Sequence, residues 1–573
     1  MLNPAMALQI PTRGTLYQVM NDMYNQLFRN LLFDHDPTTK VSLAVDNWTS
    51  PNNLAFMAIN GYYITKDWEY REHLLGFESL EGAHTGKNMA EILQQSLAAW
   101  RLESNLLAIT SDNASNNGTM RAHLTHQLRP ALQQLNKTTD WDAESGTIPC
   151  LAHVIQLVVR ELVCNLKIQP DNDALPTTFD ESSITDDLAS TDTFANTLRK
   201  IRLVANATNA SPQLAARFRE YQQENQRKMI QDVRTRWNST YEMCVRALLL
   251  RQAVDLWIQD SSPKYQRLRL LDHDWKQLEY MVGLLQPFSR FTKVLSKTTG
   301  PTIHLVWATY NHLFQHLERE EDKAQQLTTR ENIQEAIKAA NLKFQKYYGD
   351  TEHPKGELLA VAAALHPSRR MRAYDSEDWT SDERETYRQY ILRFYKKHYE
   401  KYEQPREVIL DVNDDIEQMI FERPHQRRAN FQNEMERYLN DENLTSPRAP
   451  ILEQWRMLEP DFPTVARMAR DILAIPLTGV GVERVFNVAR DTCHYRRSRL
   501  HASTIKKIML LKHGDKVHML DEALISHEEL AKEVIQDNQD DQDTPEIVRE
   551  EIASLLNPLL NPDEEQEIRQ RYQ

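Results

Sequence analysis

The sequence predicts an α/β domain joined to a long helical block, and three observations lead to this prediction. Short apolar runs with β-branched residues lie close together between residues 41 and 110, which is typical of the strands of one sheet. Apolar residues recur at helical spacing between the third run and the fourth. From residue 192 to about 443 the chain is rich in Leu, Ala, Gln, Glu, Lys and Arg and poor in glycine, which favours helices.

The first predicted strand, residues 41–46, contains a charged residue at its end. Leu43 and Val45 alternate with small residues, which predicts that at least one face of this strand is buried. Burial of the Asp46 carboxylate without a partner would cost several kcal/mol. A carboxylate in this position usually binds a metal ion, pairs with a basic side chain or takes part in chemistry.

Four further segments complete the predicted core. Apolar runs at 54–63 and 73–77 predict a meander with the first strand, a helix is expected over 87–100, and the run 106–110 predicts a buried strand just before Asp112. Three strands, a helix and a strand form the layout of a ribonuclease H-like core, in which parallel neighbours bring both carboxylates together. Either aspartate alone could be a loop or capping residue, but the shared layout favours a functional pair.

Several blocks of the chain resemble, in order, those of hAT-superfamily transposases. LAVDNWTS, HLLGFESLEGAHTGKN and AITSDNASNN are similar to successive blocks of that family's catalytic domain. The similarity continues in CLAHVIQLVV, DVRTRWNSTYEM and ILAIPLTGVGVERVF and extends over nearly all of residues 10–515. The resemblance implies a ribonuclease H-like catalytic core interrupted by one large all-α insertion, with a helical C-terminal dimerisation region. Helicity alone would equally allow a freestanding helical domain.

A third carboxylate follows the helical block. A new helix is predicted to begin near Val482, with Glu483 in its first turn. An acid at this position could also serve only to stabilise the helix through its interaction with the helix dipole. The resemblance identifies Glu483 with the glutamate of the family's ERxF motif and implies a triad with Asp46 and Asp112. The separation of 371 positions between Asp112 and Glu483 is expected if the helical insertion intervenes.

The expected cofactor is a pair of Mg²⁺ or Mn²⁺ ions bound by Asp46, Asp112 and Glu483. Carboxylate oxygens suit these hard cations, and two ions can activate a water or a 3′-hydroxyl and stabilise the leaving oxygen. No structural zinc is expected. Cys150 and His153 form a C-x-x-H pair without a second pair nearby, and no Cys-Cys-His-His cluster of the family's N-terminal BED finger precedes Asp46.

Candidate DNA-binding residues within the body of the chain include a histidine and an Arg-Trp motif. The resemblance places His153 beside the bound strand, where an imidazole can donate to phosphate. Arg234 and Arg236 flank Trp237 in a polar stretch, which suits phosphate contact and base stacking. By resemblance, Trp237 supports a base flipped from the hairpin formed at excision. The alternative is a tryptophan that anchors one helix to another, with both arginines paired to acids.

A basic run near the C-terminus is the last candidate. Arg496 and Arg497 belong to this run, which is mixed with apolar residues and resembles part of the family's dimerisation segment. The run could be a solvated helix face or a surface that contacts DNA phosphates.

Composition and charge limit the class of protein. The 573 residues are enough for two or three domains, and 41% hydrophobic with 26% charged residues is typical of a soluble globular protein. No apolar run approaches the ~18 residues that span a bilayer. Four scattered cysteines indicate a reducing compartment. Residues 516–573 carry a net charge of −11 and residues 166–195 a net charge of −6. Without these two segments, the total of −14 becomes a net charge of +3 for the rest of the chain. A nucleic-acid site must therefore be a local basic patch.

The predicted organisation has six parts, of which the first includes a helix from Thr15 to about Phe33 that is expected to pack on the core. The parts are an N-terminal helical segment (1–40), the first part of the core (41–165), an acidic linker (166–195), the all-α insertion (196–443), the end of the core with the dimerisation region (444–515) and an acidic tail (516–573). The linker back to the core is expected at 444–454, which contains two prolines.

These features predict a hAT-type DNA transposase, or a protein derived from one, that cleaves DNA and transfers strands with its triad. The expected partners are DNA, as transposon ends and target, and further copies of the chain through the C-terminal region, in the nucleus. The alternative is a domesticated, non-cleaving dimer that binds DNA or chromatin, which the missing BED finger and the acidic tail favour. An unrelated helical scaffold protein is a third alternative.

Overall fold

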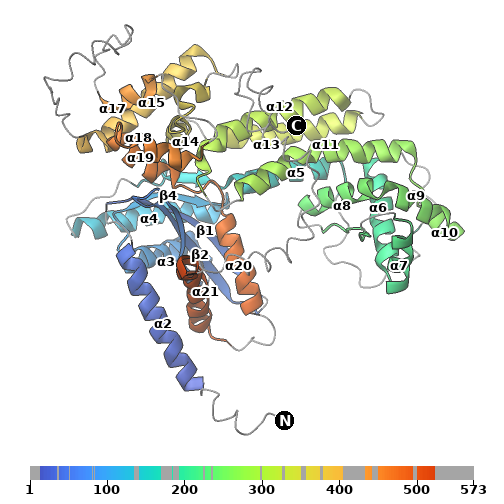
Figure 1. Cartoon of the computed structure of the whole chain (residues 1–573), viewed down its shortest axis with the longest axis horizontal. Coiled ribbons are helices and arrows are strands. Elements are labelled where there is room, and N and C mark those ends of the chain that lie inside the picture. The colour runs from blue at the N-terminus through green and yellow to red at the C-terminus, as the bar shows by residue number, and fades with distance from the viewer. Residues whose placement is uncertain are drawn as a thin grey trace. The chain divides into compact units, whose positions relative to one another are not determined.

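The structure is a computed structural model of the chain (Figure 1). The residues that it describes are 13–34, 38–50, 52–80, 82, 84–134, 141–168, 184, 193–222, 226–233, 237–296, 300–324, 330–349, 356–374, 379–403, 433–441, 449–493 and 500–522. The chain divides into two compact units, Met1–Leu511 and Lys512–Gln573. The fold described below belongs to the first unit.

One five-stranded mixed sheet forms the centre of this unit. Its strand order is β3-β2-β1-β4-β5. β1 (Val41–Thr49), β2 (Ala55–Ile64) and β3 (Tyr70–Ser79) form an antiparallel meander, and β4 (Leu106–Ser111) and β5 (Thr147–Pro149) continue the sheet in parallel with β1. The predicted strands and the parallel pairing of the first with the fourth are confirmed. β1 continues three residues beyond its predicted end, so Asp46 lies inside the strand.

Helices from both ends of the chain cover the two faces of the sheet. They are α3 (Gly86–Ala99), α4 (Ser115–Gln134), α20 (Val480–Thr492) and the first turns of α21 (Ala502–Glu522). Leu43 and Val45 of β1 pack with α3 and α4, whereas Ala44 packs on the opposite face with α20 and α21. Because side chains alternate along a strand, Asp46 shares the face of Ala44, toward α20.

The N-terminal helix α2 (Arg13–Asp34) packs on the core with only part of its apolar surface. Tyr24 contacts the cluster formed by the sheet, α20 and α21, and Leu27 is buried. In contrast, Leu16, Val19 and Met23 are 55%, 50% and 44% exposed. The predicted packing of this helix on the core is therefore confirmed at Tyr24 and Leu27 and does not extend to this second group.

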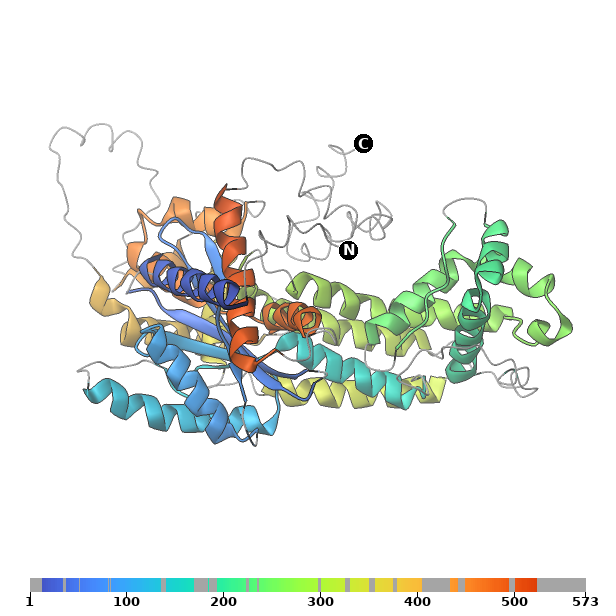
Figure 2. The ribbon, with the colours of Figure 1, turned by 90° about the horizontal axis from the view of Figure 1, so that it is seen from below.

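Helices occupy the described residues between β5 and α20. They are α5 (Leu151–Asn165), α6 (Phe194–Asn209), α7 (Pro212–Glu220), α8 (Trp237–Leu249), α9 (Arg251–Gln259), α10 (Pro263–Gln266), α11 (Asp272–Leu295), η3 (Ile303–Leu305), α12 (Val306–Lys323), α13 (Arg330–Gly349), α14 (Glu357–Ala364), η5 (Arg370–Tyr374), α15 (Ser381–His398), η6 (Glu400–Tyr402), α17 (Glu434–Asn440), α18 (Ile451–Leu458) and α19 (Pro463–Leu473). One large apolar cluster joins α5 to most of them. Figure 2 shows the long helices α11, α12 and α13 extending away from the sheet.

The end of the predicted linker at 444–454 is helical. α18 begins at Ile451, directly after Pro450, and its Trp455 is fully buried against Tyr438 of α17. Proline fixes the backbone of the residue that precedes the first helical position, which suits this start. The linker prediction is therefore wrong for residues 451–454, and residues 442–448 lie outside the described ranges.

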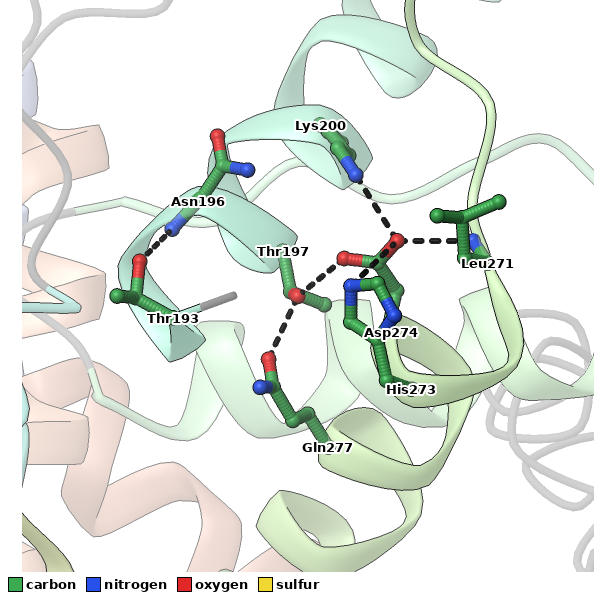
Figure 3. A network of polar contacts seen from close by, with 8 residues as sticks. All are labelled: Thr193, Asn196, Thr197, Lys200, Leu271, His273, Asp274 and Gln277. Carbon is green, nitrogen blue, oxygen red and sulfur yellow. Dashed lines mark hydrogen bonds and ion pairs between the residues drawn. The ribbon is translucent and has the colours of Figure 1, made fainter. Parts of the chain in front are cut away.

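Buried ion pairs lock the helical block internally. Figure 3 shows Lys200 of α6 with its Nζ 2.9 Å from Oδ2 of Asp274 in α11, and both side chains are at most 4% exposed. Thr197 Oγ1 donates to the other carboxylate oxygen at 2.6 Å, and the Leu271 N–H donates to Oδ2 at 2.8 Å. Asp274 thus has a cation and two further donors. None of the helices in the described ranges is long and apolar enough to span a membrane.

Candidate active site

Asp46 lies in the buried strand β1 close to two other carboxylates. The N–H of Asn47 donates to its Oδ1 at 2.8 Å. Burial is the main influence on the pKa of Asp46, which rises to about 7, and the negative charges of Asp112 and Glu483 raise it further against the effect of the Asn47 N–H. The structure therefore brings the three predicted acids within electrostatic reach of one another.

Asp112 occupies the turn between β4 and α4, beside the strand that carries Asp46. The Ala114 N–H donates to its Oδ1 at 3.1 Å, and Nδ2 of Asn117 donates to the same oxygen at 2.5 Å. Asn117 is only 3% exposed, so its amide has little freedom to turn away. These two donors hold the Asp112 carboxylate in a fixed place at the carboxyl end of β4.

Glu483 reaches the sheet through a loop that crosses the carboxyl end of β4. Thr110 Oγ1 donates to the Pro476 carbonyl at 2.6 Å, and the Gly479 N–H donates to Cys150 Sγ at 3.3 Å. Both bonds tie this loop to the core, so that α20 begins next to the sheet. Glu483 lies in the first turn of α20, as predicted, with an exposed side chain.

Gly481 permits the first turn of α20 to approach the sheet closely. A Cβ at this position would clash with the side chains of Glu72 and Tyr62, which are joined by a hydrogen bond of 2.7 Å between the Tyr62 hydroxyl and Glu72 Oε1. A larger residue would fit only if the ends of these two side chains moved aside. The position of Glu483 therefore depends on a glycine two residues before it.

His153 lies in the first turn of α5, within one turn of the Cys150 thiol, whose pKa is influenced by two of the acids. Burial raises the pKa of the Cys150 thiol to about 11, hydrogen bonds from the N–H groups of Gly479 and His153 oppose this, and the charges of Glu483 and Asp46 raise it further. The backbone of His153 is therefore close to a thiol on which the charges of Glu483 and Asp46 act, and its contact with DNA stays a prediction.

Trp237 begins α8 and is half buried against the apolar cluster of the helical block. Nearby Asp232 is buried and pairs with Arg202, whose Nη2 lies 2.7 Å from Oδ2. The ring thus makes the helix contacts of the anchoring alternative. Arg234 and Arg236 lie outside the described residues, and so do Arg496 and Arg497.

Sequence analysis missed Asn117 and Arg121, which lie one helical turn apart on α4. Nη1 of Arg121 donates to Ser111 Oγ at 2.6 Å, at the end of β4. Burial lowers the pKa of the Arg121 guanidinium, and the neighbouring Asp112 carboxylate opposes this. Two polar residues four apart on a helix that follows the catalytic strand were the available signal, because such residues share one face.

The donors around Asp46 suit a divalent cation, although no preformed three-ligand site exists in the described ranges. There, no three His, Cys, Asp or Glu side chains are close enough together to hold one ion. However, Oδ1 of Asn117 is buried without a hydrogen-bond partner, which is typical of a position that water or an ion satisfies. Among the described residues, no ion pair involves Asp46. Carboxylate oxygens are the kind of ligand that Mg²⁺ and Mn²⁺ prefer.

Three family models match this chain. The ZBED1 RNase-like domain matches residues 44–139, the ZBED1 RNase-like helical domain matches residues 148–284, and the hAT family C-terminal dimerisation region matches residues 434–514. Asp46 and Asp112 lie in the first matched segment and Glu483 lies in the third.

Similar proteins cover nearly the whole chain. A "Putative transcriptional regulator tpeD" from Talaromyces stipitatus is 33% identical over 97% of this chain and 63% of its own length. A "Putative AC transposase" from Zea mays is 24% identical over 88% of this chain and 60% of its own. "Zinc finger BED domain-containing protein DAYSLEEPER" from Arabidopsis thaliana is 22% identical over 82% of this chain and 62% of its own. The chain thus spans about 60% of the length of these relatives.

Proposed function

Because the chain belongs to the hAT transposase family, we propose that it is a DNA transposase, or a protein derived from one, that cleaves DNA and transfers strands with Asp46, Asp112 and Glu483. One observation carries the proposal. Acids from a central strand, a neighbouring turn and a helix 371 residues further on influence the same buried carboxyl group. Clustered carboxylates with a strongly raised pKa are typical of a functional site rather than of a structural one.

The three acids would hold two Mg²⁺ or Mn²⁺ ions, which supply an activated water or 3′-hydroxyl and stabilise the leaving oxygen of the phosphodiester. Asp46 would be one of the ligands in this proposal, because the charges of Asp112 and Glu483 both act on its carboxyl group and it has no ion pair of its own among the described residues. The N–H donors of Ala114 and Asn117 occupy Oδ1 of Asp112, which leaves Oδ2 for a metal ion.

Asn117 and Arg121 act as positioning residues in this proposal. Asn117 holds the Asp112 carboxylate directly, and Arg121 holds Ser111, the residue before it, through a hydrogen bond of 2.6 Å. A mostly buried guanidinium next to Asp112 also keeps that part of the site from being uniformly negative, which favours approach of a DNA phosphate. His153, Trp237 and the arginines at 234, 236, 496 and 497 are proposed to contact DNA without performing chemistry.

We further propose that the helical block is an insertion into the catalytic core. The chain leaves the sheet after β5 and α5, and it returns at α20, where Val485 and Phe486 pack with Ala44 and Phe77 of the sheet. α20, which follows the helical block in the sequence, is thus part of the same core as the strands that precede the block. Self-association through the region at 434–514 and a nuclear location belong to the same proposal, since the matched dimerisation region and the DNA substrate support them.

A DNA-cleavage assay tests the enzymatic proposal. Purified chain is incubated with a hairpin-forming DNA duplex and Mn²⁺, and strand breaks are followed on denaturing gels. We expect breaks with the native chain, loss of at least ~10³-fold for Asp112→Ala because a metal ligand is removed, and unchanged breaks for Glu91→Gln, an exposed acid of α3. Breaks that persist in Asp112→Ala would contradict the assignment of the triad.

The second candidate function is a dimeric DNA-binding regulator that does not cleave. The 33% identity to a protein described as a putative transcriptional regulator favours it. The same assay separates the two candidates when DNA binding is measured in parallel by fluorescence anisotropy. Binding of the hairpin duplex without any Mn²⁺-dependent break supports the regulator and contradicts the transposase.

A further inference from the structure

The loop that precedes α20 is held from two sides. On one side, Thr110 of β4 donates to the carbonyl of Pro476. On the other side, the N–H of the next residue, Leu477, donates to Thr302 Oγ1 at 3.3 Å. Thr302 lies between α11 and η3, in the helical block. The loop that leads to Glu483 is therefore fixed between the sheet and the helical block.

The C-terminal end of α11 supplies two further contacts of the helical block. Thr478 Oγ1 donates to the Leu295 carbonyl at 3.1 Å, and Arg484 Nη2 donates to the Ser296 carbonyl at 2.8 Å. Leu295 is the last residue of α11 and Ser296 is its C-cap, a place where carbonyl groups have no N–H partner within the helix. The end of α11 thus requires donors from outside, and the segment that carries Glu483 provides them.

The three contacts differ in their exposure to water. Thr478 and Thr302 are 6% and 9% exposed, so loss of either hydroxyl would leave a buried backbone group without its partner. Arg484 is exposed, and its guanidinium is favoured near the C-terminal end of a helix by the helix dipole. Two buried bonds and one exposed bond therefore join the start of α20 to the end of α11.

α11 is itself fixed within the helical block. Its first turn contains Asp274, which pairs with Lys200 of α6 at 2.9 Å. Further along the helix, Phe288 is fully buried and stacks on Phe344 of α13. Because packing holds this helix along its length, its C-terminal end is a firm support for the loop that it contacts.

We propose that the end of α11 positions Glu483 for metal binding. The positioning residues are Thr478, Arg484 and Thr302. This inference rests on the proposed function of the triad and gives the helical block a part in the active site. Glu483 has an exposed side chain, and its N–H donates to the Gly479 carbonyl in the first turn of α20, so its placement depends on how this turn is held. Removal of groups that support a metal ligand typically lowers metal affinity or activity by about 10- to 100-fold.

The first test is Mn²⁺-dependent cleavage of the hairpin duplex by Thr478→Val, which keeps the shape of the side chain and removes the donor to Leu295. We expect kcat to fall and the Mn²⁺ concentration for half-maximal rate to rise, each about 10-fold, at an unchanged KM for DNA. Thr478→Ser keeps the hydroxyl and should recover most of both. The matched control is Thr208→Val, a buried threonine of α6 that donates to the Val204 carbonyl of its own helix. This control should cleave as the native chain does.

The second test is amide hydrogen exchange of residues 480–486, measured by mass spectrometry, which does not depend on cleavage. Arg484→Met removes an exposed contact and should leave the fold intact. It should speed exchange in this segment about 5-fold, as the loss of one typical hydrogen bond predicts. Thr478→Val should have the same effect, whereas Thr208→Val should not change exchange there.

The outcomes separate this inference from the proposed function. A native chain that makes no Mn²⁺-dependent breaks would overturn the proposed function. Faster exchange in Arg484→Met and Thr478→Val would then still support the end of α11 as the element that holds α20, and unchanged exchange would overturn it. A native chain that cleaves, with both variants at the native rate, Mn²⁺ requirement and exchange, would overturn this inference alone. A lower rate at an unchanged Mn²⁺ requirement would overturn the positioning role, because the contact would then be structural only.

Discussion

Two buried aspartates, one in the helical block and one in the sheet, have opposite surroundings. Asp274 is fully buried and has Lys200 at 2.9 Å, with Thr197 and the Leu271 N–H as further donors. Asp46 is mostly buried as well, but its neighbours are Asp112 and Glu483, and the pKa of its carboxyl group rises to about 7. A cation compensates the first carboxylate, whereas like charges surround the second.

Under the proposed function, this difference separates structural from functional use of the same residue type. A paired carboxylate fixes the packing of two helices, and the chain supplies everything that it needs. A carboxylate among like charges costs folding free energy until a cation from solution arrives, which is typical of sites that bind metal. Four predictions test this contrast, in order of decreasing effect.

Lys200→Met should cost the most stability. It leaves Asp274 buried without its cation, and breaking a buried pair costs about 3–5 kcal/mol. Urea unfolding followed by circular dichroism measures the loss. Lys200→Met/Asp274→Leu should recover most of it, because no unpaired charge remains. Lys87→Met, at an exposed pair on α3, is the control and should change little. A single variant as stable as the native chain would show that Asp274 is compensated by other groups.

Asp46→Asn should stabilise the metal-free chain, in contrast to Lys200→Met. The pKa of Asp46 is raised in the folded chain from 3.8 to about 7, so the folded state holds the proton more tightly than the unfolded state between these values. The free energy of unfolding therefore falls as the pH rises from about 4 to 7. Asp46→Asn removes this loss, so it should raise the free energy of unfolding by ~2–4 kcal/mol at pH 8 and by less at pH 5.

Urea unfolding with a chelator at both pH values checks the prediction for Asp46→Asn, and the same variant should lose DNA cleavage. An equal change in stability at pH 5 and pH 8 would contradict it, because the effect must follow the ionisation of this carboxyl group.

Gly481→Ala should cost about 1–3 kcal/mol, the usual range for overpacking, and should lower cleavage. The added methyl group meets the Glu72 and Tyr62 side chains, so the first turn of α20 has to move away from the sheet and take Glu483 with it. Thermal unfolding and the cleavage rate measure the two effects. The control is Gly283→Ala in α11, where a Cβ meets nothing within 4 Å. This substitution should raise the free energy of unfolding by ~0.5–1 kcal/mol. Equal behaviour of both variants would show that α20 tolerates a larger residue.

Arg121→Met should have the smallest effect, with the fold retained and kcat for cleavage lowered ~10-fold at unchanged KM, because the turn that carries Asp112 loses one support. Arg121→Lys should recover part of the rate, since it keeps a positive charge near Asp112. Arg129→Met, two turns further along α4 and 63% exposed, is the control. A change in stability without any change in kcat would make Arg121 purely structural.

Local pattern was sufficient to predict the sheet and two of the acids. Alternating apolar residues specify strands, and parallel strands bring Asp46 and the residue after β4 to the same edge. The meeting of Glu483 with them was implied by the family motif alone, because no local pattern spans the intervening helices. Its geometry depends on particular contacts, such as the Thr110 bond to Pro476 and the space left at Gly481.

Other features could not be predicted because they depend on tertiary placement. Arg121 looks like an ordinary helix residue until α4 is packed beside β4. Helical periodicity predicted α2, but periodicity cannot tell which of its apolar residues this chain buries and which stay exposed. The start of α18 was missed because Pro450 suggested a loop, whereas proline also suits the residue before a helix.

The position of Glu483 near the end of the first compact unit has a consequence for protein synthesis. A ribosome makes Asp46 and Asp112 early and the third acid only after a further 371 residues. Under the proposed mechanism, a prematurely terminated polypeptide that stops before α20 is unable to cut chromosomes, however well its earlier segments fold. Under the same mechanism, the proposed triad is complete only when nearly all of the first compact unit has been synthesised.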